Sequence, residues 1–267
     1  MDKNQQKEIY IHVGMPKTGS TYLRTHFFPQ LTDVDYVNVT TGDNPITSLV
    51  REFIRFQQEY GRAVDTAPLP DCKKYEQPIH HFLNSLPGKK IVFSWSSFIC
   101  ATGGARDDFK SVGPLTKCLK TVFPHARIIL IIRRQDELIE SMYSQVLKKI
   151  GYEESFQSFL RFQPEEPSSR DQIYIEPAFC DYSRFYDQYR DAFGAENILV
   201  LPFEQLKGNP EAFLKALAGF MGATHVPSEK KKNKENISFS QGSARAAMLF
   251  NRFKRNSSRL IVKVLGK

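Results

Sequence analysis

The stretch IYIHVGMPKTGSTYLRTHFF, residues 9–28, predicts a β-strand, a loop bracketed by two glycines and the first turns of a helix. This order is typical of loops that bind phosphate groups. In the motif of nucleoside-triphosphate-binding proteins, G-x-x-x-x-G-K-[ST], the lysine comes directly after the second glycine. Here Gly14 and Gly19 keep that spacing, but Ser20 follows them and the lysine is Lys17, inside the loop. The displaced lysine disfavours an ordinary kinase or ATPase.

The chemistry of this loop suits an anion. Its two glycines allow tight backbone turns. The amides of residues 18–21 open a helix, so they point outward with the positive end of the helix dipole behind them. The alternative, a capped turn between a strand and a helix, needs fewer glycines and hydroxyls than this loop has. We therefore predict that a phosphate group is bound by Lys17, Thr18, Gly19, Ser20 and Thr21.

The composition is that of a globular protein. Of the 267 residues, 41% are hydrophobic and 25% are charged, values that are typical of folded domains. The apolar run IILII at residues 128–132 is far too short to span a bilayer, and the polar start MDKNQQKE lacks the apolar stretch of a secretory signal. Four cysteines are scattered without a C-x-x-C pair. These features predict a cytoplasmic protein with reduced thiols.

Charge divides the chain into two parts. Residues 228–267 contain 11 Lys and Arg against 2 Asp and Glu, whereas the whole chain has a net charge of +8. We expect one α/β domain over residues 1–227 and a basic C-terminal extension over 228–267 that packs on the domain or closes over it. The cations and apolar residues of the extension also allow peripheral contact with the inner face of an anionic membrane. The sequence contains no motif of a nucleic-acid-binding fold, so we expect no nucleic-acid partner.

Strand-like and helix-like segments alternate along the domain. Strand-like runs occur at residues 8–14, 89–95, 126–133 and 197–203, and the middle runs are continuous in β-branched and aliphatic residues, which is typical of strands covered on both faces. Apolar residues at helical spacing occur within residues 112–122, 136–150 and 213–221. This alternation predicts an α/β fold, a parallel sheet flanked by helices in three layers.

A second group of polar residues follows the strand at 126–133. Arg133 comes at the end of that strand, and Ser141 lies eight residues later in the next helix. Ligands of doubly wound sheets gather at the carboxyl ends of the strands. We therefore expect the planar fork of Arg133 to lie beside the first loop and to bind a second phosphate, to which Ser141 donates its hydroxyl. The alternative for Arg133 and Arg134 is a pair of surface salt bridges with the acidic residues of 136–140.

Together these segments resemble one enzyme family. HVGMPKTGSTYL (12–23) is similar to the 5′-phosphosulfate-binding loop of the sulfotransferases that use 3′-phosphoadenylyl sulfate (PAPS), and IIRRQDELIESMYSQ (131–145) resembles their 3′-phosphate-binding segment. Residues 181–222 resemble a later helix, strand and helix of bacterial members. The resemblance implies a P-loop-like sulfotransferase fold, with Lys17 near the bridging oxygen of the donor. It also implies adenosine 3′,5′-bisphosphate (PAP) as the product, and no metal ion.

The resemblance leaves the general base open. Many carbohydrate-acting relatives have a glutamate at the position that is Ser96 here. His12, just before the loop, is the best-placed replacement, because an imidazole titrates near neutrality. The alternative for His12 is a strand histidine that is hydrogen-bonded beneath the loop. Further candidates are His80, His81, Asp107 and Asp108.

Two classes of function follow. The first is transfer of a sulfuryl group from PAPS to a hydroxyl or amine of an acceptor, such as a glycan, a lipid-linked glycan or glycolipid, or a small hydroxylated metabolite. The second is a P-loop nucleotide-binding or kinase-like protein, or a catalytically silent relative, which the missing glutamate suggests. The acceptor surface comes from segments without a recognisable motif, so the sequence names neither the acceptor nor the oligomeric state.

Overall fold

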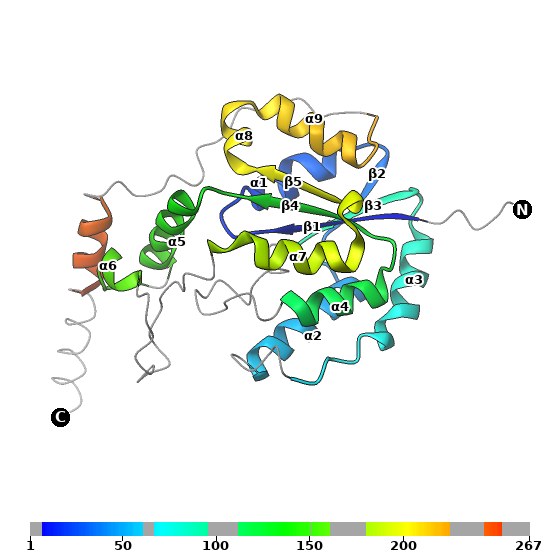
Figure 1. Ribbon diagram of the computed structural model, residues 1–267, viewed down its shortest axis with the longest axis horizontal. Coiled ribbons are helices and arrows are strands. Elements are labelled where there is room, and N and C mark those ends of the chain that lie inside the picture. The colour runs from blue at the N-terminus through cyan, green and yellow to red at the C-terminus, as the bar shows by residue number, and fades with distance from the viewer. Residues whose placement is uncertain are drawn as a thin grey trace, which may run out of the picture.

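The computed structural model describes residues 7–60, 67–95, 112–149, 151–160, 180–224 and 243–252. Over these residues the chain forms a five-stranded parallel sheet in the order β2-β3-β1-β4-β5. The strands are β1 (Glu8–Gly14), β2 (Val34–Val37), β3 (Lys90–Ser94), β4 (Arg127–Ile132) and β5 (Ile198–Pro202). The predicted α/β fold with a parallel sheet is confirmed, and the central strand β1 leads into the predicted loop (Figure 1).

Helices cover both faces of the sheet, as Figure 1 shows. The helices are α1 (Ser20–Tyr22), α2 (Pro45–Tyr60), α3 (Glu76–Ser85), α4 (Val112–Val122), α5 (Gln135–Lys149), α6 (Phe156–Phe159), α7 (Tyr182–Phe193), α8 (Phe203–Gly208) and α9 (Pro210–Phe220). A π-helical segment, Leu23–Phe27, continues α1, and 3-10 turns cover Phe28–Gln30, Lys73–Tyr75 and Ala195–Asn197. Helices α1, α8 and α9 lie on one side of the sheet, and α2, α4 and α7 lie on the other.

Strand β1 is buried on both faces, which explains its continuous apolar sequence. Ile9 and Ile11 belong to a hydrophobic core that they share with residues of α2, α4, α5 and α7. Tyr10 belongs to a second core, together with residues of α9. Because alternate residues of a strand point to opposite faces, His12 lies on the same face as Tyr10, where its ring meets Phe28.

The parallel register decides which residues meet at the carboxyl edge of the sheet. His12 of β1 is level with Ser94 of β3 and with Ile129 of β4. Gly14, the last residue of β1, is level with Ile131. Arg133 therefore follows β4 just beyond the level at which the loop leaves β1. The sheet brings the loop, the end of β3 and Arg133 to a common edge, where ligands of such sheets bind.

The four strands expected from the sequence are present as β1, β3, β4 and β5, and helices α4, α5 and α9 match the expected helical segments. Strand β2 was not predicted. Its sequence VDYV has four residues with only the outer two buried, and it pairs only with β3, at the edge of the sheet. A run this short and this unevenly buried shows no period that distinguishes it from a loop.

Part of the basic extension is described. Residues 243–252 are helical, and Ala244 and Met248 pack against the larger core. The side-chain amide of Asn251 donates to the carbonyl oxygens of Leu147 and Tyr152, each at 3.0 Å. This segment therefore packs on α5 and the turn that follows it, beside α6 in Figure 1. The described part of the extension does not include Lys230, Lys231, Lys232 and Lys234. Among all the described residues of the chain, no helix is long and apolar enough to cross a bilayer.

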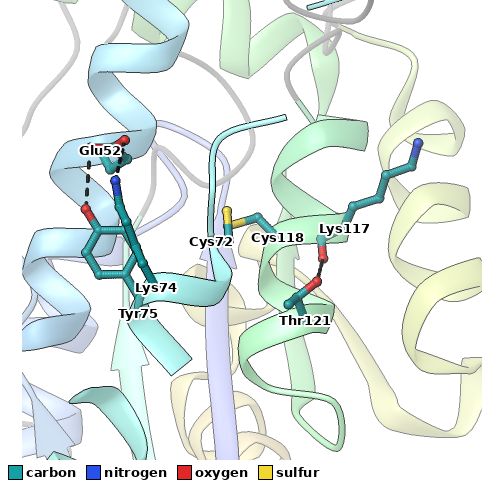
Figure 2. The surroundings of a disulfide bond; sticks show 7 residues. All are labelled: Glu52, Cys72, Lys74, Tyr75, Lys117, Cys118 and Thr121. Atoms are coloured by element: carbon teal, nitrogen blue, oxygen red, sulfur yellow. Dashed lines mark hydrogen bonds and ion pairs between the residues drawn. A yellow bond between two sulfur atoms is a disulfide. The ribbon is translucent and has the colours of Figure 1, made fainter. Parts of the chain in front are cut away.

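The prediction of reduced thiols is wrong for two of the four cysteines. Cys72 and Cys118 form a disulfide with a Cα–Cα distance of 5.6 Å. Figure 2 shows that the bond joins the segment before α3 to α4, while Lys74 and Tyr75 donate to the Glu52 carboxylate of α2. Both cysteines are buried in the larger core. No local pattern predicts this pair, because the two residues are 46 positions apart and meet only when α4 packs beside this segment.

We expect the disulfide to stabilise the fold by restricting the unfolded chain. The bond closes a loop between two residues that are 46 positions apart. Reduction, or the double change Cys72→Ala and Cys118→Ala, removes this cross-link from the unfolded chain and should lower the free energy of unfolding by about 2–4 kcal/mol. Urea denaturation under oxidising and reducing conditions measures this. Cys180→Ala, at a free cysteine, is the control and should respond to reductant as the wild type does. An unfolding midpoint that does not change with reductant would contradict the prediction.

Candidate functional site

The loop between β1 and α1 holds two residues in left-handed backbone conformations. Gly19, which precedes α1, has a φ of 81°, and Lys17 has a φ of 66°. Lys17 is the one non-glycine residue with a positive φ among the described residues, and such a conformation is unfavourable for residues with a Cβ. Successive turns of this kind direct backbone amides toward one side, which makes a nest for an anion. The phosphate-binding role expected from the glycine spacing stays a prediction, and left-handed backbone at two positions of the loop is compatible with it.

The base of the loop is tightly packed around Gly14. A Cβ at this position would lie 2.6 Å from the Ser20 Oγ and 2.9 Å from the His12 Nε2. Neither of these two atoms has a hydrogen-bond partner, although both are buried. Because buried polar atoms are normally paired, two unpaired ones that converge on the same point of the loop mark a place prepared for a polar ligand.

His12 is a buried, neutral histidine. Its side chain is fully buried, and its Nδ1 shares a hydrogen bond of 2.6 Å with the Ser94 Oγ. Burial, together with the smaller effect of the nearby positive charge of Arg24, lowers the pKa of His12 from its usual value to about 3. The imidazole therefore carries no charge at neutral pH. These surroundings favour the second of the two interpretations of His12 from the sequence, a strand histidine that is hydrogen-bonded beneath the loop.

The three hydroxyl side chains of the loop have different surroundings. Thr18 is buried and donates its hydroxyl to the carbonyl oxygen of Met15 at 2.6 Å, so this hydroxyl already serves the loop itself. Ser20 is buried with its hydroxyl unpaired, whereas the side chain of Thr21 is exposed. Ser20 is therefore the hydroxyl that the structure leaves available at the base of the loop.

Arg133 joins the second predicted segment to the first. Its Nη1 donates to the carbonyl oxygen of Lys17 at 3.0 Å, and its Nη2 donates to the Glu137 carboxylate at 3.0 Å. The guanidinium lies over the ring of Phe203, 5.0 Å from its centre, and the Tyr182 hydroxyl donates to the carbonyl oxygen of Arg133. Arg133 forms one of the ion pairs that the alternative interpretation expected, with Glu137, but only 9% of Arg133 is exposed, so this pair is not at the open surface. Its bond to Lys17 places it at the loop.

The acidic neighbours of the two arginines behave differently. Arg134 forms an exposed ion pair with Asp136 at 2.6 Å, as the alternative interpretation expected for it. Glu137 is shared between Arg133 and Lys207 of α8, and these two cations lower its pKa, Lys207 more strongly. Ser141 lies one helical turn beyond Glu137 on α5 and is buried, so by its spacing it continues the line from Arg133 along one side of this helix.

The other candidates are not brought to this site. His80 and His81 are exposed on α3, which lies at the opposite end of the sheet from the loop (Figure 1). Ser96, Asp107 and Asp108 lie outside the described residues. Arg245 is exposed in the helical segment 243–252. Over the described part of the chain no group of three or more His, Cys, Asp or Glu side chains is arranged to hold a metal ion.

The sequence did not indicate Phe203, Tyr182 or Lys207 as site residues. A Cβ on Gly19 would lie 3.0 Å from the Phe203 ring, so this ring supports the loop as well as Arg133. These residues come from α7 and α8, about 50 or more positions after Arg133, and no local motif links them to it. Glu137 differs from them, because its spacing of four residues from Arg133 at the start of a helix predicts an ion pair between the two side chains.

The parallel sheet, with a glycine-bracketed loop at the end of its central strand, places the chain in the class of P-loop-like α/β folds. The family model described as "Sulfotransferase family" matches residues 10–227, and the chain belongs to this family. No curated protein sequence matches the chain.

Several solved structures are similar to the chain, and the first one below, with a TM-score above 0.5, shows the same fold. A sulfotransferase from Alicyclobacillus acidocaldarius is similar with a TM-score of 0.56 and 17% identity, over 85% of this chain and 87% of that one. A sulfotransferase domain from the curacin biosynthetic pathway has a TM-score of 0.46 and 13% identity, over 90% and 82% of the two chains. A mouse sulfotransferase complexed with PAP has a TM-score of 0.37 and 14% identity, over 92% and 76%. At these identities the likeness concerns the fold alone.

We expect the buried His12 to make stability depend on pH. Its pKa is near 6.5 in the unfolded chain and about 3 in the folded protein, so the unfolded chain binds the additional proton between these values. Stability is then lost as the pH falls from 6.5 toward 3, by up to about 1.4 kcal/mol per pH unit.

His12→Asn removes the titrating group while keeping a side chain that can bond to Ser94. Urea denaturation of both proteins at a series of pH values isolates the contribution of His12, since all other titrating groups are shared. The unfolding free energy of the wild type should fall more steeply with acid than that of the variant. Parallel curves would mean that His12 does not titrate as a buried neutral ring.

Proposed function

We propose that the protein transfers a sulfuryl group from PAPS to a hydroxyl or amine of an acceptor. One observation carries the proposal. The Arg133 guanidinium reaches the loop that contains Lys17, so a phosphate bound at the loop and a second phosphate bound at Arg133 have adjoining sites. A nucleotide with a 5′-phosphosulfate and a 3′-phosphate has two anionic groups of this kind. Membership of the sulfotransferase family supports this choice of donor over a nucleoside triphosphate.

The residues of the loop fit the phosphosulfate group. Outward amides, the Ser20 hydroxyl and the His12 Nε2 are the polar groups at its base, and the last two are buried without a partner. In the proposed complex Thr18, Gly19, Ser20 and Thr21 bind the 5′-phosphosulfate through their amides and hydroxyls. Arg133 and Ser141 bind the 3′-phosphate, the guanidinium as a charged hydrogen-bond donor.

The donor supplies an activated sulfuryl group, and the protein supplies its electrostatic surroundings. We propose that the ammonium group of Lys17 lies where negative charge develops on the departing phosphate, as a preorganised positive charge does in catalysis. The left-handed backbone at Lys17 fixes the start of this side chain. His12 stays neutral and contributes a ring nitrogen to the base of the loop, because its low pKa prevents it from holding a proton near neutral pH.

A general base with a pKa of about 3 is poorly matched to chemistry near pH 7. We therefore propose that His12 positions the loop and does not remove the acceptor proton. Asp107 and Asp108 remain the carboxylates to test for that role, and both lie outside the described residues. His80 and His81 belong to α3, a helix that lies at the other end of the sheet in Figure 1, and are weaker candidates.

The acceptor and the location of the protein remain proposals from the sequence. We propose a glycan, a lipid-linked glycan or a small hydroxylated metabolite as acceptor, and a cytoplasmic location with the basic extension at the inner face of a membrane. The disulfide between Cys72 and Cys118 is unusual for a cytosolic protein. Alkylation of thiols in intact cells, followed by mass spectrometry of the Cys72 peptide, tests the location directly, since an oxidised pair argues for another compartment.

The proposed function predicts a preference for two phosphates. PAP should bind at least tenfold more tightly than adenosine 5′-phosphate, because only PAP has a group for Arg133, and a hydrogen bond to a charged group contributes roughly 1.5–3 kcal/mol. Isothermal titration calorimetry measures both, with ATP and magnesium as the third ligand. Equal affinities for PAP and adenosine 5′-phosphate, or tightest binding of ATP with magnesium, would favour the kinase-like alternative.

Lys17→Ala should reduce turnover far more than product binding. If its charge acts on the departing phosphate, turnover falls roughly 100-fold or more, while the affinity for PAP changes much less. Transfer of radiolabelled sulfate from PAPS to a panel of hydroxylated acceptors, combined with PAP titrations, separates the two effects. Lys215→Ala, at an exposed lysine of α9, is the matched control. An equal loss in both quantities would make Lys17 a ground-state phosphate ligand only.

A further inference from the structure

We propose that Arg133 is also a positioning residue for Lys17, through a contact that does not involve the 3′-phosphate. This inference rests on the proposed function and adds a second role to a residue assigned there to the 3′-phosphate alone. The Nη1 of Arg133 donates to the main-chain carbonyl oxygen of Lys17 at 3.0 Å. The guanidinium thereby holds the backbone from which the Lys17 side chain starts.

The backbone at Lys17 needs such a contact. With a φ of 66° it occupies the left-handed region, which a residue with a Cβ leaves unless its surroundings hold it there. Lys17 sits in the middle of the loop, with no regular hydrogen-bond ladder on either side, because β1 ends at Gly14 and α1 begins at Ser20. A fixed donor on its carbonyl oxygen stabilises this conformation, in addition to the bond from the Thr18 hydroxyl to the carbonyl oxygen of Met15 in the same loop.

Arg133 is rigid enough to act in this way. Its side chain is buried, its Nη2 donates to the Glu137 carboxylate at 3.0 Å, and its plane lies over the Phe203 ring. Glu137 is in turn paired with Lys207. The main chain at Arg133 is held separately by the Tyr182 hydroxyl. The donor that reaches Lys17 is thus fixed from both the side chain and the main chain.

Phe203 connects this arrangement to the other end of the loop. The Phe203 ring that lies under the guanidinium also packs against Gly19. A Cβ added at Gly19 would lie 3.0 Å from this ring. The second left-handed residue of the loop, Gly19, is therefore supported by the neighbour that supports Arg133. The two left-handed residues share one support, which is the end of β5 and the start of α8.

The guanidinium has capacity for both roles. Of the five N–H groups of an arginine, one on Nη1 bonds to Lys17 and one on Nη2 bonds to Glu137, and the Nε is buried without a partner. One N–H on each terminal nitrogen is left for a phosphate. Occupying the 3′-phosphate site therefore does not require that Arg133 release the loop. The two phosphate sites are coupled through one side chain.

The test uses a ligand that lacks the 3′-phosphate. If Arg133 acts only on that group, Arg133→Ala leaves the affinity for adenosine 5′-phosphate unchanged. If Arg133 positions the loop, the same change weakens adenosine 5′-phosphate about tenfold, a loss at the lower end of that for a hydrogen bond to a charged group. Ser141→Ala is the matched control, since it removes a 3′-phosphate contact and should weaken PAP alone. Arg134→Ala controls for the loss of one positive charge from an exposed neighbour.

Hydrogen–deuterium exchange of the protein without ligand gives a second readout. Arg133→Ala should raise amide exchange about tenfold or more in peptides that cover residues 15–21, and leave β1, β3 and β4 protected. Ser141→Ala and Arg134→Ala should leave the loop as it is. A rise spread over the whole sheet, or no rise at all, overturns the inference.

The two proposals fail separately. Wild-type protein that binds PAP and adenosine 5′-phosphate equally well contradicts the proposed function. Arg133→Ala protein that binds adenosine 5′-phosphate as tightly as the wild type, with an unchanged loop in exchange, overturns only the positioning role of Arg133.

Discussion

The site depends on how the chain turns back over the end of its central strand. Strand β1 is bonded on one side to β3 and on the other to β4, so its last residue, Gly14, has a fixed position. The chain then has to reverse between Gly14 and Ser20 to begin α1. The reversal is achieved with left-handed backbone at Lys17 and Gly19. Turns that contain such residues are the backbone geometry on which the proposed phosphate site depends.

Several polar groups around the loop are buried at a cost to stability. The Nε2 of His12, the Oγ of Ser20 and the Nε of Arg133 have no partner in the protein, and each such atom is unfavourable when it is removed from water. A protein optimised for stability alone would pair or replace them. All three belong to residues at the end of β1 or beside it, and in the proposed complex a bound polar ligand gives them hydrogen-bond partners.

Charge at the site is balanced by residues that the ligand does not have to displace. Arg133 is paired with Glu137, which also pairs with Lys207, and Arg134 is paired with Asp136. The pairing fixes the direction of the Arg133 fork before a ligand arrives, and preorganised donors avoid the cost of ordering during binding. Helix α8 contributes Phe203 and Lys207, so the last strand of the sheet and the helix after it stabilise the loop near the start of the chain.

Features with a local signal could be predicted from the sequence alone. The alternation of strand-like and helical segments was enough to predict the parallel α/β fold. The loop with Lys17 between Gly14 and Gly19, the segment that begins at Arg133, and residues 181–222 carried the resemblance to the family. Contacts between distant segments were decided only by the tertiary structure. Ser94 and Phe28 enclose His12 and make it a neutral ring, Cys72 meets Cys118, and Phe203 lies under Arg133. The physical reason is that burial, pKa and pairing depend on which residues pack together across the sheet, and that information is absent from any single segment of the chain.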